Sequence, residues 1–430
     1  MPVARPDPAP VRRLALALRP RHLQSEPSPD RICGPSPVSP ATGHRGPGIP
    51  IPIPSPINRS TMKRTHALLL TAALLSGCSS SEAEIVTSPI KVASYNLYLG
   101  ADIAPIMAAT DGATLIGAVS AAWAQVLAND FTLRAVAIAD QIEAEGPDLI
   151  GLQEVSIYRV QSPGDAIVGG TVPATDVVFD FLDILLAELA SRGLTYAEVS
   201  SIENVDVEMP FTFDGGVTFD DLRLTDRDVI LAKAGTTTAG PLAMNFSDAV
   251  TLPVVVGDPP GIPIMVKRGW CSINAMAGDT WFTFVNTHLE TVLDLGIPGI
   301  HAYETYYQEG QAVELMGALA TFPTPIVLVG DLNSAADGST SRSYPNTINA
   351  GFGDAWTSAM GDGYTCCQDE DLLNADNSVF TERIDFILGN GDISFSGADR
   401  IGEEVADKET VLGLWPSDHS GVAATANIPQ

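Results

Sequence analysis

Six short groups of acidic, amide and histidine residues stand out along this 430-residue chain. In chain order they are Asn96, Gln153-Glu154, Asn286-Thr287-His288, Gly330-Asp331-Leu332-Asn333, Arg383-Ile384-Asp385 and Ser417-Asp418-His419. Hydrolysis of a phosphate ester needs a cation to neutralise the phosphoryl oxygens, a base to activate water and a donor near the leaving oxygen. The groups supply residue types for each task, so their combination predicts metal-assisted phosphate-ester hydrolysis.

The acidic groups follow stretches that have the pattern of buried strands. Glu154 closes an apolar run that begins at Asp148, so its carboxylate would emerge at a strand end, where ligands usually bind. Such a carboxylate suits a hard ion such as Mg²⁺. Asp331 and Asn333 end a second apolar run and are two residues apart, which would place them on one side. One of them could hold water while the other donates a hydrogen bond to phosphate.

The histidines also lie where strands are expected to end. His288 closes the alternating run that starts at Trp281, and from there an imidazole can reach a pocket. Asp418 and His419 are adjacent, so on an extended chain they would point to opposite sides and take different partners. Asp385 is then the more natural carboxylate to orient an imidazole, and this contact would raise the basicity of the histidine and fix its tautomer.

Each group also has an ordinary structural explanation. Gly-Asp-x-Asn after an apolar run is a common strand-to-turn transition, because these residues favour turns. His288 could be a hydrogen-bonded structural residue, Asn96 a strand asparagine bonded to backbone, and Asp418-His419 a solvated pair. Six such groups at strand ends, with the residue types of one reaction, favour the catalytic interpretation.

In this order the groups resemble the motifs of the endonuclease/exonuclease/phosphatase superfamily, the deoxyribonuclease I-like hydrolases, from about Lys91 to Pro429. The resemblance implies an α/β fold, a four-layer α/β/β/α sandwich of two packed mixed sheets flanked by helices. It also implies that Glu154 is the principal Mg²⁺ ligand, with Asn96 and Asp418 on the metal side. Mn²⁺ or Ca²⁺ could take the place of Mg²⁺.

The same resemblance implies the roles of the other residues. Asp331 and Asn333 would orient the attacking water and contact the phosphate. His419 would act as base or as transition-state donor with Asp385 as its partner, and His288 would contact the phosphate or the leaving group. Because members of this superfamily include nucleases, inositol-polyphosphate phosphatases and sphingomyelinases, the resemblance indicates a reaction type and leaves the substrate open.

Three helices are expected between these strands. Apolar residues recur at helical spacing from Phe131 to Ile142, before Gly146-Pro147 would end the helix. A second stripe runs from Val178 to Leu189, and a third helix is expected from about Tyr303 to Leu319. Helices that alternate with strands fit the α/β sandwich.

The N-terminal residues predict an export signal. Residues 1–61 hold 15 of the 32 prolines, so we expect them to be disordered and to come from a start assigned too far upstream. Residues 62–77 combine a basic start with a short apolar stretch, as in a signal peptide. Cys78 follows in Leu-Ser-Gly-Cys, which resembles a bacterial lipobox, so a lipidated Cys78 would anchor the protein to a membrane.

The expected product is an exported lipoprotein with one domain. Residues 78–90 would form a tether and residues 91–430 the catalytic domain, which we expect to be monomeric. By resemblance to lipoprotein sorting, Ser79 rather than an aspartate after the cysteine favours the outer membrane where the cell has one, or else the cell surface. The alternative for the apolar stretch is a buried helix followed by a chance cysteine.

The charge of the chain bears on its substrate. The whole chain has 23 basic and 52 acidic residues, and the part after residue 77 has 13 and 49, a net charge of −36. Binding to a nucleic-acid backbone depends on Lys and Arg, so this balance weakens a nuclease interpretation without excluding it. Arg227, Lys233, Lys267 and Arg268 could form a local basic cluster, or they could belong to a solvated face.

Two further features leave alternatives open. For Cys271, Cys366 and Cys367 we expect one disulfide, between Cys271 and one of the adjacent pair, and no thiol nucleophile. The acidic stretch Leu194–Asp226 could be a loop that shapes the substrate site or a plain surface insertion.

The substrate predictions follow in order. A phosphodiester, including nucleic acid, comes first; a phospholipid or sphingolipid headgroup is close behind, and a phosphomonoester is third. A non-catalytic binding module that keeps the fold is the alternative of another class.

Overall fold

The computed structural model describes residues 86–247, 249–255, 263–291 and 301–430. The predicted proline-rich extension, the signal peptide, Cys78 and most of the tether lie outside the described residues. Among the described helices, none is both long and apolar enough to cross a membrane.

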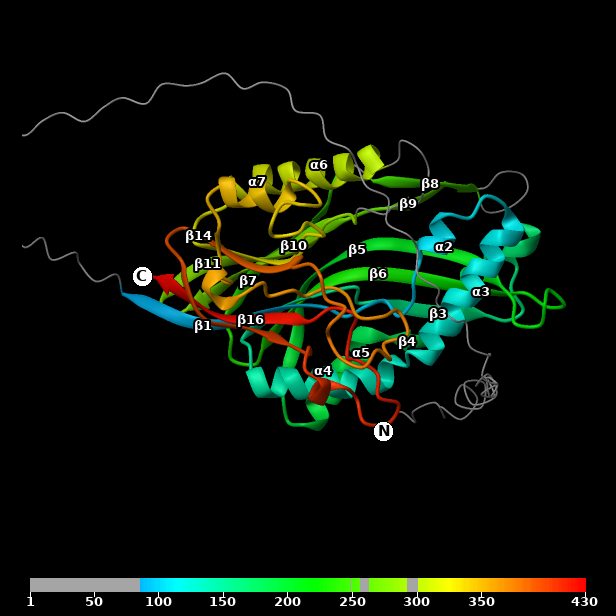
Figure 1. The fold of residues 1–430 in the computed structure, drawn as a ribbon, viewed down its shortest axis with the longest axis horizontal. Coiled ribbons are helices and arrows are strands. Elements are labelled where there is room, and N and C mark those ends of the chain that lie inside the picture. Colours follow the sequence, from blue (N-terminus) through cyan, green and yellow to red (C-terminus); the bar gives the residue numbers. More distant parts are fainter. Residues whose placement is uncertain (1–85, 248, 256–262, 292–300) are drawn as a thin grey trace, which may run out of the picture. The chain divides into compact units, whose positions relative to one another are not determined.

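Two mixed sheets form the centre of the described domain (Figure 1). The first has eight strands, in which β5 pairs with β6 and the remaining order is β15-β16-β1-β2-β6-β3-β4. Their bounds are β1 (Thr87–Asn96), β2 (Leu149–Gln153), β3 (Ile157–Gln161), β4 (Asp176–Asp180), β5 (Tyr196–Phe211), β6 (Asp220–Lys233), β15 (Ser394–Ile401) and β16 (Gly421–Pro429).

The second sheet has six strands in the order β13-β14-β12-β11-β10-β7. Their bounds are β7 (Thr238–Asn245), β10 (Gly269–Ala277), β11 (Thr280–His288), β12 (Ile326–Asp331), β13 (Gly353–Asp354) and β14 (Asp385–Asn390). A separate pair is formed by β8 (Val250–Val255) and β9 (Pro263–Val266). Each large sheet contains one parallel pair, β1 with β2 and β11 with β12.

The two sheets pack face to face through a shared apolar core. Val92, Leu149 and Ile230 of the first sheet are buried against the second sheet, which contributes Phe284 and Val329. Alternation along these strands explains the arrangement, because every second side chain points toward the other sheet.

Helices cover both outer faces, as Figure 1 shows with α6 and α7 on one side and α4 and α5 on the other. The first sheet packs against α2 (Ala104–Met107), α3 (Gly112–Ala128), α4 (Phe131–Glu145) and α5 (Phe181–Ser191). The second packs against α6 (His301–Leu319) and α7 (Ser343–Asn349). Short 3-10 helices are η1 (Ala166–Val168), η2 (Ser358–Met360) and η3 (Val405–Asp407). The predicted four-layer sandwich is confirmed.

The predicted helices are present, with one boundary corrected. Gly146 ends α4 in the left-handed conformation (φ 60°), which glycine adopts without steric cost. The second helix begins at Phe181, because the Asp180 side chain accepts hydrogen bonds from the first turn. Val178 belongs instead to strand β4.

Two expectations are wrong. The stretch 194–226 is not a loop, since most of it forms the long antiparallel pair β5 and β6, although several of its residues do line the cleft described below. Cys271 is a free thiol buried between the two sheets, whereas Cys366 and Cys367 form a disulfide with each other. Because Cys271 points into the intersheet core, it cannot reach the loop that holds the other two cysteines.

Candidate active site

The strand registers bring the predicted residues to one end of the sandwich. Across the second sheet His288 is paired with Asp331, and Asp331 with Asp385, so three side chains form a row. Across the first sheet Asn96 is paired with Gln153, the residue before Glu154. Polar residues at strand ends therefore meet because neighbouring strands end together.

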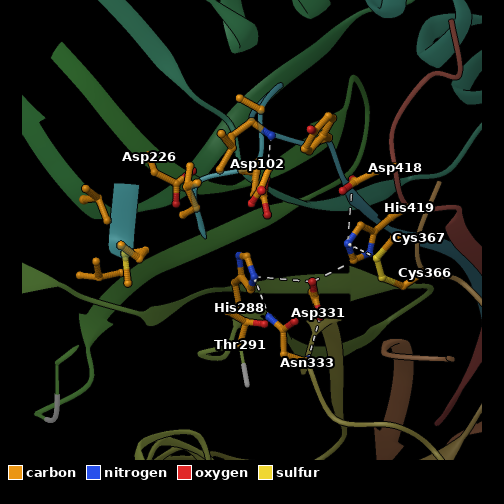
Figure 2. Close-up of a pocket in the computed structure, with 18 of the residues that line it drawn as sticks. Asp102, Asp226, His288, Thr291, Asp331, Asn333, Cys366, Cys367, Asp418 and His419 are labelled. Carbon is orange, nitrogen blue, oxygen red and sulfur yellow. Dashed lines mark hydrogen bonds and ion pairs between the residues drawn. A yellow bond between two sulfur atoms is a disulfide. The ribbon is translucent and has the colours of Figure 1, made fainter. Parts of the chain in front are cut away.

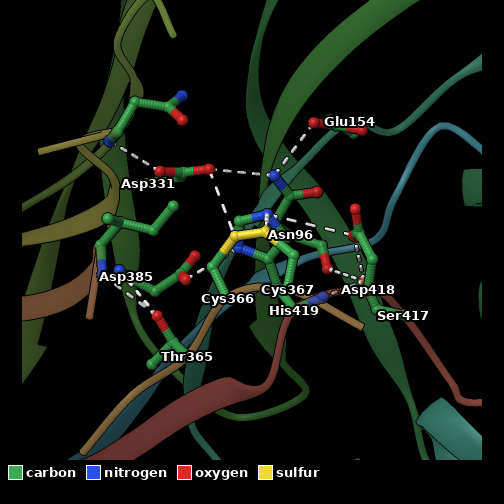
Figure 3. The surroundings of a disulfide bond; sticks show 12 residues. Asn96, Glu154, Asp331, Thr365, Cys366, Cys367, Asp385, Ser417, Asp418 and His419 are labelled. Carbon is green, nitrogen blue, oxygen red and sulfur yellow. Dashed lines mark hydrogen bonds and ion pairs between the residues drawn. A yellow bond between two sulfur atoms is a disulfide. The ribbon is translucent and has the colours of Figure 1, made fainter. Parts of the chain in front are cut away.

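Asn96 connects the two sheets. Its Nδ2 donates hydrogen bonds to Glu154 Oε1 (3.0 Å) and to Asp331 Oδ2 (3.1 Å), as Figure 3 shows. Its side-chain oxygen accepts the backbone N–H of Tyr98 (2.9 Å), so the amide nitrogen, which cannot ligate a metal, faces the acids. Glu154 Oε2 accepts the backbone N–H of Leu99 (2.6 Å). Asn96 thereby fixes the carboxylates of both sheets relative to each other.

A second set of contacts surrounds Asp331. Its Oδ1 accepts the backbone N–H of Asn333 (2.8 Å), and its Oδ2 lies 3.5 Å from His288 Nε2 (Figure 2). The Asn333 side-chain amide is 3.1 Å from the same His288 nitrogen. Asp331, Asn333 and His288 therefore form one hydrogen-bonded group in the wall of a cleft.

His419 contacts Asp385 on the other side of Asp331. The distance from His419 Nδ1 to Asp385 Oδ2 is 2.9 Å, and Asp418 lies farther from the ring at 4.0 Å. Burial would lower the pKa of His419, but the carboxylates of Asp385 and Asp418 outweigh it and raise that pKa well above the usual value. The imidazolium form is therefore favoured here.

Negative charge is crowded in the buried part of this site. Burial, followed by the charge of Asp385, raises the pKa of Asp331 to about 7. Burial also raises the pKa of Asp418 to about 7, and Glu154 adds to that effect while His419 opposes it. Donor atoms of Asp331, Asp385 and His419 all lie within 4.8 Å of one another. A divalent cation would relieve the repulsion among the carboxylates, and carboxylate oxygens suit Mg²⁺ or Ca²⁺.

Three residues of the site have left-handed backbones although they are not glycines. Their φ angles are 55° at Tyr98, 57° at Glu154 and 48° at Asn333. Such conformations cost about 1 kcal/mol or more each and persist where the surroundings hold them. They turn the chain sharply after β1, β2 and β12, which aims the polar side chains into the cleft.

Residues 93–419 match the sequence model of the Endonuclease/Exonuclease/phosphatase family. The chain belongs to this family. The match extends from β1 to His419 and contains every site residue predicted from the sequence. Membership in the endonuclease/exonuclease/phosphatase family indicates a phosphoester hydrolase.

Several solved structures are similar to this chain. Truncated TDP2 from Caenorhabditis elegans is 17% identical, with a TM-score of 0.43, over 79% of this chain and 98% of that one. A family protein from Leptotrichia buccalis is 14% identical, with a TM-score of 0.47, over 78% of this chain and 99% of that one. A family protein from Bacteroides thetaiotaomicron is 16% identical, with a TM-score of 0.45, over 80% of this chain and 99% of that one. No curated protein matches this chain.

The endonuclease/exonuclease/phosphatase site opens into a cleft of about 510 Å³. Asp331, Asn333, Asp418 and His419 line one part of it, together with the Cys366–Cys367 disulfide. Figure 2 shows this disulfide beside His419, where Cys367 Sγ lies 3.8 Å from Nε2. Another part is apolar and is lined by Leu99, Ile103, Ile106, Val207, Met209 and Leu224.

The four basic residues considered as a nucleic-acid cluster do not gather in this cleft. Arg227 pairs with Asp180 (2.8 Å), and Lys233 donates to the Gly146 carbonyl (3.2 Å). Among the described lining residues, Arg268 is the single Lys or Arg, against seven carboxylates. The lining is therefore strongly acidic.

Arg268 is a site residue that the sequence motifs did not indicate. It is buried, with Nη1 3.0 Å from His288 Nδ1 and Nη2 3.4 Å from Glu290. Since a guanidinium only donates, Nδ1 must accept, and a neutral His288 then carries its hydrogen on Nε2. Burial and Arg268 lower the pKa of His288 well below its usual value. His288 thus presents a neutral N–H donor that faces Asp331 Oδ2 (3.5 Å), while the Asn333 amide nitrogen donates to the Leu289 carbonyl (2.9 Å).

Asp226, which lines the cleft, and Asp228, whose Oδ1 lies 3.9 Å from His288 Nδ1, were also missed. They are two residues apart on β6, and Asn204 Nδ2 donates to Asp228 Oδ2 (2.9 Å) and, more weakly, to Asp226 Oδ2 (3.4 Å). Burial, with Glu154 next, raises the pKa of Asp226 to about 6. Alternation along β6 was the available signal, because it places both acids on one face.

Proposed function

We propose that this chain is an exported, lipid-anchored, Mg²⁺-dependent phosphodiesterase in which water attacks phosphorus. The observation that carries the proposal is the meeting of Glu154, Asp331 and His419 around one cleft, from strands far apart in the sequence. A binding module would not need this set of carboxylate, amide and imidazole groups together.

The residues divide the chemical tasks between them. Glu154 and Asp418 would hold the cation, which supplies charge neutralisation for the phosphoryl oxygens. Asp331 is close enough to Asn333 and Asn96 for its carboxylate to be oriented toward a water molecule. His288 would donate its neutral N–H to a phosphoryl oxygen. His419, charged through its contact with Asp385, would stabilise the developing negative charge or protonate the leaving oxygen.

A lipid-type phosphodiester fits the cleft better than nucleic acid does. The acidic lining would repel a polyanionic backbone, whereas a single phosphate could be neutralised by the cation. The apolar part of the same cleft would accept an alkyl or acyl substituent of the ester. We therefore propose a phosphodiester with an apolar substituent, such as a phospholipid or sphingolipid, and keep nucleic acid as the competing substrate.

A parallel assay tests the reaction and the substrate. The purified protein, with Mg²⁺, Mn²⁺ or EDTA, would be offered plasmid DNA, bis-para-nitrophenyl phosphate, para-nitrophenyl phosphate and sphingomyelin. Metal-dependent hydrolysis of a diester is the expected result, with sphingomyelin preferred over plasmid DNA. Faster hydrolysis of DNA than of sphingomyelin would contradict the lipid assignment. No hydrolysis of any of the four substrates would favour the binding module.

A chain-length series tests the apolar part directly. For alkyl para-nitrophenyl phosphodiesters, kcat/KM is expected to rise about twofold to fourfold per methylene until the cleft is filled, since each buried methylene contributes about 0.8 kcal/mol. Val205 and Val207 both line the cleft, so the isosteric double variant Val205→Thr, Val207→Thr should flatten this dependence. Val217→Thr, a change at a valine that is 81% exposed, is the matched control. A flat series in the unmodified protein would remove the apolar substituent from the proposal.

Export and anchoring are supported by the lipobox-like sequence at Cys78 and by the Cys366–Cys367 disulfide, a bond that persists mainly in oxidising compartments. In cells that express the chain, labelled palmitate is expected to enter the protein, and Cys78→Ser should abolish that incorporation. Undiminished label in the variant would contradict the lipid anchor without affecting the assignment of the reaction.

A further inference from the structure

A second group of carboxylates lies apart from the catalytic residues. Asp165 precedes η1 in the connection between β3 and β4, Glu208 is on β5, and Asp221 is on β6. One carboxylate oxygen from each lies within 4.8 Å of the other two. None of the three lines the catalytic cleft or belongs to the motifs of the sequence.

Two oxygens of this group are buried without a hydrogen-bond partner. Asp221 is fully buried, and its Oδ2 accepts the backbone N–H groups of Asp165 (2.6 Å) and Ala166 (3.0 Å). Asp221 Oδ1 has no partner, and neither has Asp165 Oδ1. Leaving a buried carboxylate oxygen unpaired is costly, so native proteins normally satisfy such atoms with a donor, a water or an ion.

Arg223, which is paired with Glu208 across β5 and β6, compensates this group only in part. Within the described ranges, none of the three carboxylates forms an ion pair with a lysine or arginine, and nearby Arg223 is engaged by Asp206. Because Arg223 is held by Asp206, three carboxylates share little positive charge, and a bound cation would stabilise them.

Two glycines allow the backbone to close around the carboxylates. A Cβ at Gly164 would lie 2.6 Å from the carboxyl carbon of Asp221, and one at Gly170 would overlap the carboxylate of Asp165. The connection from β3 to β4 therefore wraps tightly over the β5 and β6 pair at this point.

We propose that Asp165, Glu208 and Asp221 bind a structural Ca²⁺ ion that ties the segment 162–174 to strands β5 and β6. All the side-chain donors are oxygens, which disfavours zinc and other metals that prefer nitrogen or sulfur. Ca²⁺ accepts irregular sets of six to eight oxygens, and backbone carbonyls and water could complete the set, whereas Mg²⁺ demands a regular octahedron. The site is independent of the proposed function, because it contains no catalytic residue.

Calcium titration of the full chain carrying Glu154→Gln tests the proposal, since this background weakens binding in the catalytic cleft. Calorimetry is expected to show Ca²⁺ binding with a Kd of about 10⁻³ M or lower, as in extracellular calcium sites. Mg²⁺ should bind more weakly than Ca²⁺. Thermal unfolding should show Tm raised by about 3–6 °C at saturating Ca²⁺.

The decisive comparison introduces Asp165→Asn and Glu208→Gln into the Glu154→Gln chain. Both positions have partly exposed side chains, and buried Asp221 is left unchanged. These changes should weaken Ca²⁺ binding at least about 30-fold and remove the increase in Tm. Asp176→Asn with Glu203→Gln, at exposed positions, changes the net charge equally and should alter neither quantity. Binding that survives in the first variant, or no Ca²⁺ binding in the Glu154→Gln chain at millimolar concentrations, would overturn the assignment.

Discussion

Glu154→Gln is expected to reduce metal-dependent hydrolysis by on the order of 10³-fold or more, with little loss of stability. The Glu154 carboxylate stands at a strand end and lines the same cleft as Asp418, and its charge is what would hold the cation. Glutamine keeps the shape of the side chain but loses that charge, and its NH2 group must face either Asn96 Nδ2 or the Leu99 N–H, which costs one hydrogen bond. Since Glu154 raises the pKa of Asp418, its neutralisation also relieves repulsion in the folded protein.

Two measurements distinguish this explanation from a general disturbance. In the unmodified protein Mg²⁺ should raise Tm, because a ligand that binds only the folded state stabilises it, and in the variant this increase should disappear. Glu203→Gln, at an exposed glutamate on β5, is the matched control and should keep both activity and the Mg²⁺ effect. Full activity in Glu154→Gln would remove this residue from the metal site.

His419→Ala is expected to lower kcat by about 10² to 10⁴-fold if the imidazole donates to the transition state or exchanges a proton. The ring is buried and held by Asp385 at 2.9 Å, so it is positioned before the substrate binds. KM should change much less than kcat, because the contact would strengthen only as charge develops on the leaving oxygen.

Asp385→Asn supplies the companion measurement. If Asp385 acts through His419, the double variant should be hardly worse than His419→Ala alone, since residues that work as a unit are not additive. A loss below about tenfold for His419→Ala would demote the histidine to a structural role. Additive losses would separate the two residues and leave Asp385 with a task of its own.

The local parts of the site could be predicted because strand ends have a clear signal. Apolar runs that stop at polar residues identified Glu154, Asp331 and His288, and the sheet registers then explain why these residues meet. The registers themselves depend on which strands are neighbours, and the sequence carries no local signal for that choice. Arg268 was considered only as part of a basic cluster, and its contact with His288 was missed. Arg268 directly precedes β10, and the hairpin of β10 and β11 pairs Gly269 with His288, so the Gly278-Asp279 turn was a local signal for this contact.

Secondary structure was missed where two signals competed. Val205-Asp206-Val207-Glu208-Met209 alternates as a strand should, but its acidic composition favoured a loop. In α3 the apolar stripe from Leu115 to Val126 is surrounded by alanines and glycines that reduce the contrast between its faces. The disulfide expectation failed because the burial of Cys271 is a tertiary property.

The left-handed backbones at Tyr98, Glu154 and Asn333 have a consequence for how this protein can change. Glycine would relax each of these positions, and neutral residues would relax the crowded acids, yet both kinds of change remove groups from the cleft. Selection for heat resistance alone would therefore act against the same positions that selection for turnover maintains. The active site is the place where thermal adaptation and activity conflict, and thermostable descendants should carry their stabilising substitutions elsewhere in the sandwich.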